Sequence, residues 1–196
     1  MSVKKQWLIG LTILLLAGIG GYVYYQQTAV DNGGTSPLDP SGKPAKEVPL
    51  LTEGAKIPSF RLSSIDGQYV SLAEYQARKK PILFEFFASW CPHCQHSAPV
   101  LKKFYEKHKA NLIILGINAG DRPGGPSTSL DYQAAYKIDF PILERPFPEL
   151  LDQFHVQSFP TFYLTDASGT VLWAFKGTLT PREVSVLEKK LSKLTH

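Results

Sequence analysis

The sequence predicts an α/β domain with a mixed central sheet covered by helices on both faces, preceded by one transmembrane helix. Two apolar runs of strand length, at residues 81–87 and 112–117, indicate central strands, because strands buried on both faces are continuously apolar. Helical and strand patterns alternate through the rest of the domain, which is the order expected of a layered α/β fold. At the N-terminus, residues 7–25 (WLIGLTILLLAGIGGYVYY) carry no charged side chain.

This uncharged segment predicts a membrane-spanning helix, since a helix over residues 7–25 covers roughly 28 Å, close to the thickness of the hydrocarbon layer. Lys4 and Lys5 precede it and the next basic residue is Lys43, so the positive-inside rule places residues 1–6 in the cytoplasm. The alternative is a cleaved secretory signal, which delivers the domain to the same side. We expect a single-pass membrane protein whose C-terminal domain faces the extracytoplasmic space; the family resemblance given below implies that this membrane is the bacterial inner membrane and that the space is the periplasm.

The composition separates a linker from a folded domain. Residues 26–49 are rich in Gly, Pro, Ser and Asp and hold hardly any large apolar side chain, which predicts a flexible linker. The folded domain is expected over residues 50–196. The net charge is +4 and the basic residues are scattered, without a basic run interleaved with aromatic residues. We therefore expect no nucleic-acid partner.

Two short strands are expected to open the domain, at residues 59–62 and 68–71, joined by an Asp-Gly turn at 66–67. They form an N-terminal β-hairpin. The apolar run at residues 81–87 follows as a strand buried on both faces.

The middle of the domain alternates helix and strand. A helix is expected from about residue 92 to 107, then the second buried strand at 112–117. A loop is expected over residues 119–128, followed by helical segments at 132–136 and 147–154.

A hairpin and a helix are expected to close the domain. Residues 161–165 and 171–175 alternate in polarity and are joined by Asp-Ala-Ser-Gly at 166–169, which is a hairpin signal. The last helix begins at Pro181. Its apolar stripe consists of Val184, Leu187, Leu191 and Leu194.

Only two cysteines are present, and both lie in Trp90-Cys91-Pro92-His93-Cys94. A disulfide scaffold needs more cysteines spread along the chain, and so short a loop gains little stability from a disulfide. Positions i and i+3 at the start of a helix lie about 5–6 Å apart, within the range that a disulfide requires. The spacing therefore predicts a redox-active Cys91–Cys94 disulfide.

The two thiols are expected to differ. Cys91 is predicted at the helix N-cap with Pro92 at the first helical position, and the helix dipole stabilises a thiolate there by up to about 2 kcal/mol. A protonated His93 would add to this effect. Cys94, one turn inward, is expected to be the resolving thiol. The alternative is half of a zinc site, but no other cysteine exists and His96 points to a different helix face, so we expect no metal and no cofactor.

Residues 84–94 (FEFFASWCPHC) resemble the active-site strand and helix of the thioredoxin superfamily. Residues 57–194 resemble the TlpA/ResA-like branch of membrane-anchored thioredoxins, with an Asp-Gly hairpin, a helical insertion at about 128–150 and the segment VQSFPT at 156–161. The resemblance implies a thioredoxin-like fold and a thiol–disulfide oxidoreductase activity.

The resemblance also implies roles for single residues. Pro160 is expected to be cis and to pack beside the cysteines, where the backbone of Phe159 would pair with an extended substrate segment. Trp90 is expected to flank the nucleophile. Glu85 would be a buried acid that shuttles a proton for Cys94; the alternative is a carboxylate at a strand edge that reaches water.

The direction of electron flow stays open on the sequence alone. The Cys-Pro-His-Cys motif and Glu85 resemble DsbA-like oxidases, whereas the framework resembles TlpA/ResA-like reductases. Members dedicated to cytochrome maturation usually carry Glu three residues after the second cysteine and often Asn at the buried-acid position, where this chain has Ser97 and Glu85. The implied partners are cysteine-containing extracytoplasmic proteins and a membrane thiol-electron carrier.

Three other functions use similar residues. A copper metallochaperone of thioredoxin-like fold usually has C-x-x-x-C, and the spacing here is one residue short. A peroxiredoxin-type peroxidase is expected to have Thr three residues before its reactive cysteine, where this chain has Ala88. A Cys–His hydrolase would lose its nucleophile to a disulfide with the neighbouring Cys94.

Overall fold

The structure, a computed structural model, describes residues 47–120, 128–144, 146 and 148–194. The predicted cytoplasmic segment, the predicted transmembrane helix and most of the predicted linker lie outside these residues. Across the described ranges, no helix is both long enough and apolar enough to cross a membrane. Val48–His196 form one compact unit.

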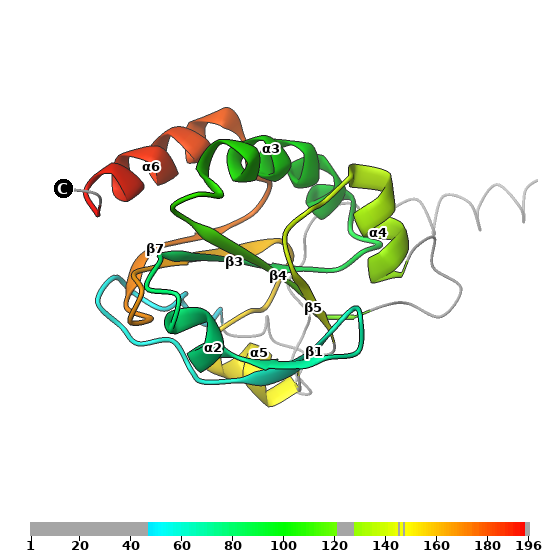
Figure 1. The fold of residues 1–196 in the computed structure, drawn as a ribbon, viewed down its shortest axis with the longest axis horizontal. Helices are drawn as coiled ribbons and strands as arrows, with labels where there is room; N and C mark the ends of the chain where they lie inside the picture. Colours follow the sequence, from blue (N-terminus) through cyan, green and yellow to red (C-terminus); the bar gives the residue numbers. More distant parts are fainter. Residues whose placement is uncertain (1–46, 121–127, 145, 147, 195–196) are drawn as a thin grey trace, which may run out of the picture. The chain divides into compact units, whose positions relative to one another are not determined.

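Seven strands form one mixed sheet in the order β2-β1-β5-β4-β3-β6-β7 (Figure 1). The strands are β1 (Arg61–Ser64), β2 (Tyr69–Ser71), β3 (Ile82–Phe87), β4 (Ile113–Asn118), β5 (Ile142–Glu144), β6 (Thr161–Thr165) and β7 (Val171–Lys176). β3, β4 and β5 run parallel, whereas β1–β2, β1–β5, β3–β6 and β6–β7 pair antiparallel. The prediction of a mixed α/β sheet is confirmed.

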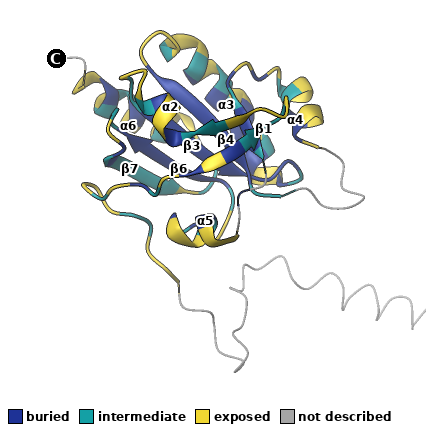
Figure 2. Cartoon of the chain, turned by 60° about the horizontal axis from the view of Figure 1, so that its bottom comes forward, coloured by how far each residue is buried: buried dark blue, intermediate teal, exposed yellow. Residues whose placement is uncertain are grey.

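Helices cover both faces of this sheet. The described residues form α2 (Leu72–Gln76), α3 (Pro92–His108), α4 (Ser129–Tyr136), α5 (Pro148–Gln153) and α6 (Pro181–Ser192). In Figure 1, α3, α4 and α6 lie on one side of the sheet and α2 and α5 on the other. Each face has its own cluster of buried apolar side chains. Figure 2 shows the central strands buried and the edge strand β7 mostly half-buried.

The central strand β3 places a carboxyl group in the core. All six of its residues are buried. Leu83 and Phe87 belong to the cluster under α3, and Phe84 and Phe86 belong to the opposite cluster. Because side chains alternate between the two faces of a strand, Glu85 lies on the α3 face with Leu83 and Phe87.

The predicted N-terminal hairpin is present, but its first strand was placed two residues too early. β1 runs from Arg61 to Ser64, because Ser63 and Ser64 pair with β5 in addition to the pairing of β1 with β2. The short helix α2 was not predicted. Its first turn is capped by the Ser71 hydroxyl, which accepts a hydrogen bond from the N–H of Glu74.

The helical insertion expected at about 128–150 contains α4 and the start of α5, and the strand β5 between them was not predicted. This strand of three residues pairs with β4 and is too short to show a period in the sequence. α4 also begins at Ser129, three residues earlier than expected. Thr128 and Asp131 form a capping box that fixes this start.

The apolar stripe of the last helix is shorter than predicted. α6 ends at Ser192, and Leu194 beyond it is 39% exposed. Leu187 and Leu191 are buried, and Val184 packs against the same cluster. Leu194 continues the sequence period but lies past the last helical turn, so it does not reach the core.

Candidate active site

Both cysteines lie where β3 ends and α3 begins. Cys91 is the N-cap residue of α3, with extended backbone angles (φ −78°, ψ 120°), and Pro92 is the first helical residue. The N–H of Cys91 donates to the carbonyl of Ala88 at 3.0 Å, which closes the turn between strand and helix. The first N–H groups of a helix have no intrahelical partner, so this end of α3 favours an anion at Cys91.

The two thiols differ in their access to solvent. Cys91 is 7% exposed and Cys94 is fully buried, and both are free thiols. The Cys91 sulfur contacts the Cys94 thiol, and it donates to the carbonyl of Phe159 at 3.6 Å. The Phe159–Pro160 peptide bond is cis. The structure therefore brings Cys91, Cys94, Phe159 and Pro160 together.

Trp90 and His93 flank the pair from two sides. The indole N–H of Trp90 donates to the carbonyl of Gly120 at 3.1 Å, and the ring packs against the cluster under α3. His93 is exposed, and its Nδ1 lies 2.9 Å from the hydroxyl of Thr178 in the loop after β7. The His93 ring is thus held by this loop.

Glu85 is a buried carboxyl group without a partner. It is fully buried, and neither side-chain oxygen has a hydrogen-bond partner among the described residues. Burial alone raises the pKa of Glu85 from 4.5 to about 8, because the ionised form loses its hydration. The alternative of a strand-edge carboxylate in contact with water is wrong, since β3 is a central strand.

Cys94 shares this buried environment. Burial raises its pKa above the ordinary value for a thiol, a hydrogen bond from the Ala88 backbone opposes this, and the nearby charge of Glu85 raises it further. Cys94 therefore holds its proton until a base takes it. With its pKa raised to about 8, the Glu85 carboxyl group can gain and release a proton near neutral pH.

A family model described as the AhpC/TSA family matches residues 54–174, more than half of the chain. The chain belongs to the AhpC/TSA family. The matched stretch contains all seven strands except the end of β7, and it contains both cysteines, Glu85 and Pro160.

Named relatives cover almost the whole chain. The thioredoxin-like protein YneN of Bacillus subtilis is 28% identical over 187 residues, which are 95% of this chain and 97% of YneN. The thiol–disulfide oxidoreductase ResA of Geobacillus kaustophilus is 26% identical over 190 residues, 92% of this chain and 94% of ResA. The resemblance to ResA-like proteins is confirmed.

Two solved structures have a similar fold. A Chlorobium tepidum protein assigned as the thiol:disulfide interchange protein DsbE superposes with a TM-score of 0.63 at 26% identity, over 73% of this chain and 97% of that one. StoA of Bacillus subtilis superposes with a TM-score of 0.55 at 23% identity, over 68% of this chain and 96% of StoA. The domain has a thioredoxin-like α/β fold.

Two further residues at the site were not predicted from the sequence. The hydroxyl of Tyr132, from α4, donates to the carbonyl of Cys94 at 3.0 Å. The buried hydroxyl of Ser97 donates to the carbonyl of His93 and accepts from the N–H of Leu179, both at 2.9 Å. Tyr132 lies 38 residues from Cys94 in the chain, and no period or motif in the sequence connects them.

Three observations concern the alternatives of a metal site and of a peroxidase. Among the described residues, no group of three or more His, Cys, Asp or Glu side chains is arranged to hold a metal ion. His96 is exposed on α3. Ala88, three residues before Cys91, is fully buried and has no hydroxyl to offer a peroxide.

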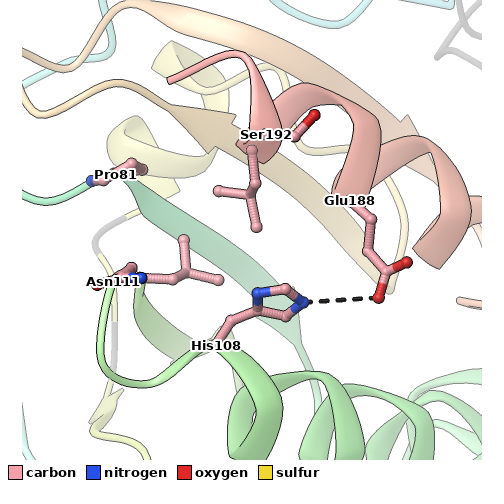
Figure 3. A pocket seen from close by; sticks show the side chains of 7 residues that line it. Pro81, His108, Asn111, Glu188 and Ser192 are labelled. Carbon is pink, nitrogen blue, oxygen red and sulfur yellow. Dashed lines mark ion pairs between the residues drawn. The ribbon is translucent and has the colours of Figure 1, made fainter. Parts of the chain in front are cut away.

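A separate pocket of about 240 Å³ lies at the other end of α3 (Figure 3). It is lined by Pro81, His108, Asn111, Leu112, Glu188, Leu191 and Ser192. His108 Nε2 lies 3.6 Å from Glu188 Oε1, and Lys107 Nζ lies 2.6 Å from the same oxygen. The 17 residues of α3 separate this pocket from Cys91 by roughly 25 Å.

Proposed function

We propose that this protein is a thiol–disulfide oxidoreductase whose Cys91–Cys94 pair, alternating between dithiol and disulfide, exchanges with the disulfides and thiols of client proteins. The observation that carries the proposal is the arrangement of one slightly exposed thiol and one buried thiol at a helix start, beside a buried carboxyl group that has no hydrogen-bond partner in the described part of the chain. The names of ResA and of the DsbE-like protein support the same reaction class.

Cys91, Cys94 and Glu85 each have one role in the exchange reaction. A Cys91 thiolate attacks a client disulfide, one client sulfur leaves as a thiolate, and Cys91 and the client form a mixed disulfide. Cys94 then gives its proton to the Glu85 carboxylate and attacks the Cys91 sulfur. The second client sulfur leaves as a thiolate and the Cys91–Cys94 disulfide forms. The client disulfide has then gained two electrons and become a dithiol, and the two cysteines of the protein have lost two electrons.

We propose that the protein works as a reductase. A strongly oxidising pair requires a stabilised reduced form. Here the Cys91 sulfur contacts the Phe159 carbonyl and the Cys94 thiol, and the hydrogen bond of the His93 ring goes to Thr178. Because the Nδ1 bond of the His93 ring is to Thr178, that bond does not stabilise the Cys91 sulfur in the reduced form, which supports a reducing pair.

A redox titration of the full-length chain against glutathione tests this direction. We expect a potential closer to the about −270 mV of thioredoxin than to the about −120 mV of a strong disulfide oxidant. A value near the oxidising end would contradict the reductive assignment while leaving disulfide exchange intact. A failure of Cys91 and Cys94 to form a disulfide at any glutathione ratio would contradict the function itself.

We further propose that the domain is tethered to the outer face of the bacterial inner membrane and acts on cysteine-containing extracytoplasmic proteins. The uncharged segment at residues 7–25, preceded by Lys4 and Lys5, supports this position. A membrane thiol-electron carrier would then restore the dithiol. Protease added outside intact spheroplasts should digest the domain, and protection of the domain under these conditions would contradict the proposed topology.

A further inference from the structure

Tyr132 connects helix α4 to the turn that carries the cysteines. Its side chain is 1% exposed, and its ring stacks on Phe87 of β3 with centroids 4.7 Å apart. Its hydroxyl donates to the carbonyl of Cys94 at 3.0 Å. A buried phenol in this geometry has a fixed ring and one directed hydrogen bond.

Helix α4 is itself fixed to the sheet. The side-chain amide of Asn118, at the end of β4, donates to the Ser129 hydroxyl at 2.7 Å, and both residues are buried. The capping box of Thr128 and Asp131 holds the first turn of the helix. Tyr132 therefore presents its hydroxyl from a rigid support.

The first turn of α3 needs such a support. Pro99 lies inside α3 and has no N–H to donate to the carbonyl of Gln95, so one hydrogen bond between the cysteine turn and the rest of the helix is missing. Cys94 must nevertheless point its sulfur at two groups in succession. It has to face Glu85 when it loses its proton and Cys91 when it attacks the mixed disulfide.

The phenol acts only as a donor. Burial, followed by the nearby charges of Glu85 and Cys94, raises the pKa of Tyr132, so the hydroxyl keeps its proton at every pH at which the protein works. Tyr132 therefore does not compete with Glu85 for the proton of Cys94.

We propose that Tyr132 is a positioning residue for the resolving step, and that its hydrogen bond to the Cys94 carbonyl holds Cys94 in line with Glu85 and with the Cys91 sulfur. This inference rests on the proposed function. In the step, the Cys94 proton passes to Glu85, the Cys94–Cys91 bond forms, and the bond from Cys91 to the client breaks with the client sulfur leaving as a thiolate.

Tyr132→Phe tests the proposal, because it removes the hydroxyl and keeps the ring that stacks on Phe87. Tyr136→Phe is the matched control, since Tyr136 lies one turn further along α4 and packs against Tyr132 with centroids 4.9 Å apart. The reduced full-length proteins are mixed with 5,5′-dithiobis(2-nitrobenzoate), an aromatic disulfide. Attack by Cys91 releases a first coloured thiolate, and attack by Cys94 on the resulting mixed disulfide releases a second.

We expect Tyr132→Phe to slow the second release about fivefold, the effect of one typical hydrogen bond, and to leave the first release and the melting temperature unchanged. The dependence of the second release on pH should keep its midpoint, because Glu85 is still present. Tyr136→Phe should change neither release. An unchanged second release in Tyr132→Phe would overturn the proposal, and so would an equal slowing of both releases together with a lower melting temperature. If the unaltered protein gave no second release, the proposed function would fail instead.

Discussion

A glutamate from a neighbouring element lies near each end of helix α3, Glu85 of β3 and Glu188 of α6, and the two carboxyl groups have opposite properties. At the N-terminal end, Glu85 is fully buried without a partner, and burial raises its pKa to about 8. At the C-terminal end, Glu188 is 37% exposed, and its hydrogen bond from Lys107 lowers its pKa below the ordinary value. The same side chain is a proton carrier at one end and a permanent anion at the other.

The difference shows that environment, and not residue type, decides where chemistry occurs. Contact with solvent and the ion pair with Lys107 stabilise the carboxylate of Glu188, so this group stays ionised near neutral pH. Glu85 has neither, and it lies beside a thiol that must lose a proton before it can react. A pocket is present near the C-terminal end of α3. Near the N-terminal end, a buried carboxyl group with a raised pKa lies beside a thiol of the redox pair.

The largest effect is expected from the cysteines themselves. Cys91→Ser should abolish disulfide exchange, because it removes the nucleophile. In the Cys94→Ser variant, Cys91 should still attack client disulfides, but the client should stay bound as a mixed disulfide because the resolving thiol is missing. Mass spectrometry of the purified variants would detect the adducts, and a Cys94→Ser protein that accumulates none would argue against a resolving role.

The next largest difference is expected between the variants Glu85→Gln and Glu188→Gln, in the rate of the resolving step. Glu85→Gln should slow the resolving step about a hundredfold, because the step loses its base. It should also remove the increase in rate that the unaltered protein shows as Glu85 loses its proton around pH 8. Stopped-flow kinetics from pH 6 to 9 measure both effects. Glu188→Gln is the control and should leave the rate unchanged. Equal rates for the two variants would contradict the role of Glu85 as the base.

The pH dependence of stability gives a third contrast. The pKa of Glu85 is raised on folding, so its favourable contribution is fully present below about pH 4.5 and is lost as the pH rises through about 8. The free energy of unfolding of the reduced protein should fall by up to roughly 5 kcal/mol over this range. Urea unfolding at intervals of pH measures the slope. Glu85→Gln should flatten it, and an equally steep slope in that variant would assign the effect to other groups.

The smallest effect is expected at the surface. Glu188→Gln removes an ion pair between two exposed side chains, and such pairs contribute less than about 1 kcal/mol. The loss should shrink further in high salt, because salt screens exposed charges. Thermal unfolding at low and high salt tests this. A loss of several kcal/mol would mean that the far end of α3 depends on its ion pairs more than the geometry implies.

The parts of the fold that could be predicted have long and uniform patterns. β3, β4 and α3 each have at least six residues with one pattern, so burial and period are readable in the sequence. α2 and β5 have only five and three residues, which are too few to show a period, and β5 forms by pairing with the distant strand β4. Long-range pairing of this kind leaves no local period.

The candidate site also has features that the sequence predicted and features that it did not. The spacing of Cys91 and Cys94 and the single charge in an apolar strand pointed to the cysteine pair and to Glu85. The contacts of Tyr132 with Cys94 and of His93 with Thr178 join residues far apart in the chain. They depend on how α4 and the loop after β7 settle on α3, and only the structure shows this.

Direct titration of Glu85 is the sharpest test, because the proposed chemistry depends on a buried carboxyl group whose pKa is raised close to neutral pH, so that its carboxylate can accept the proton of Cys94. Carbon-13 NMR of the reduced protein, labelled at the glutamate carboxyl groups, would follow Glu85 and Glu188 in one experiment, with Glu85→Gln identifying the signal. The account predicts that Glu85 titrates with a pKa of about 8 and Glu188 below its ordinary 4.5. A Glu85 signal that titrates together with the exposed glutamates would contradict it.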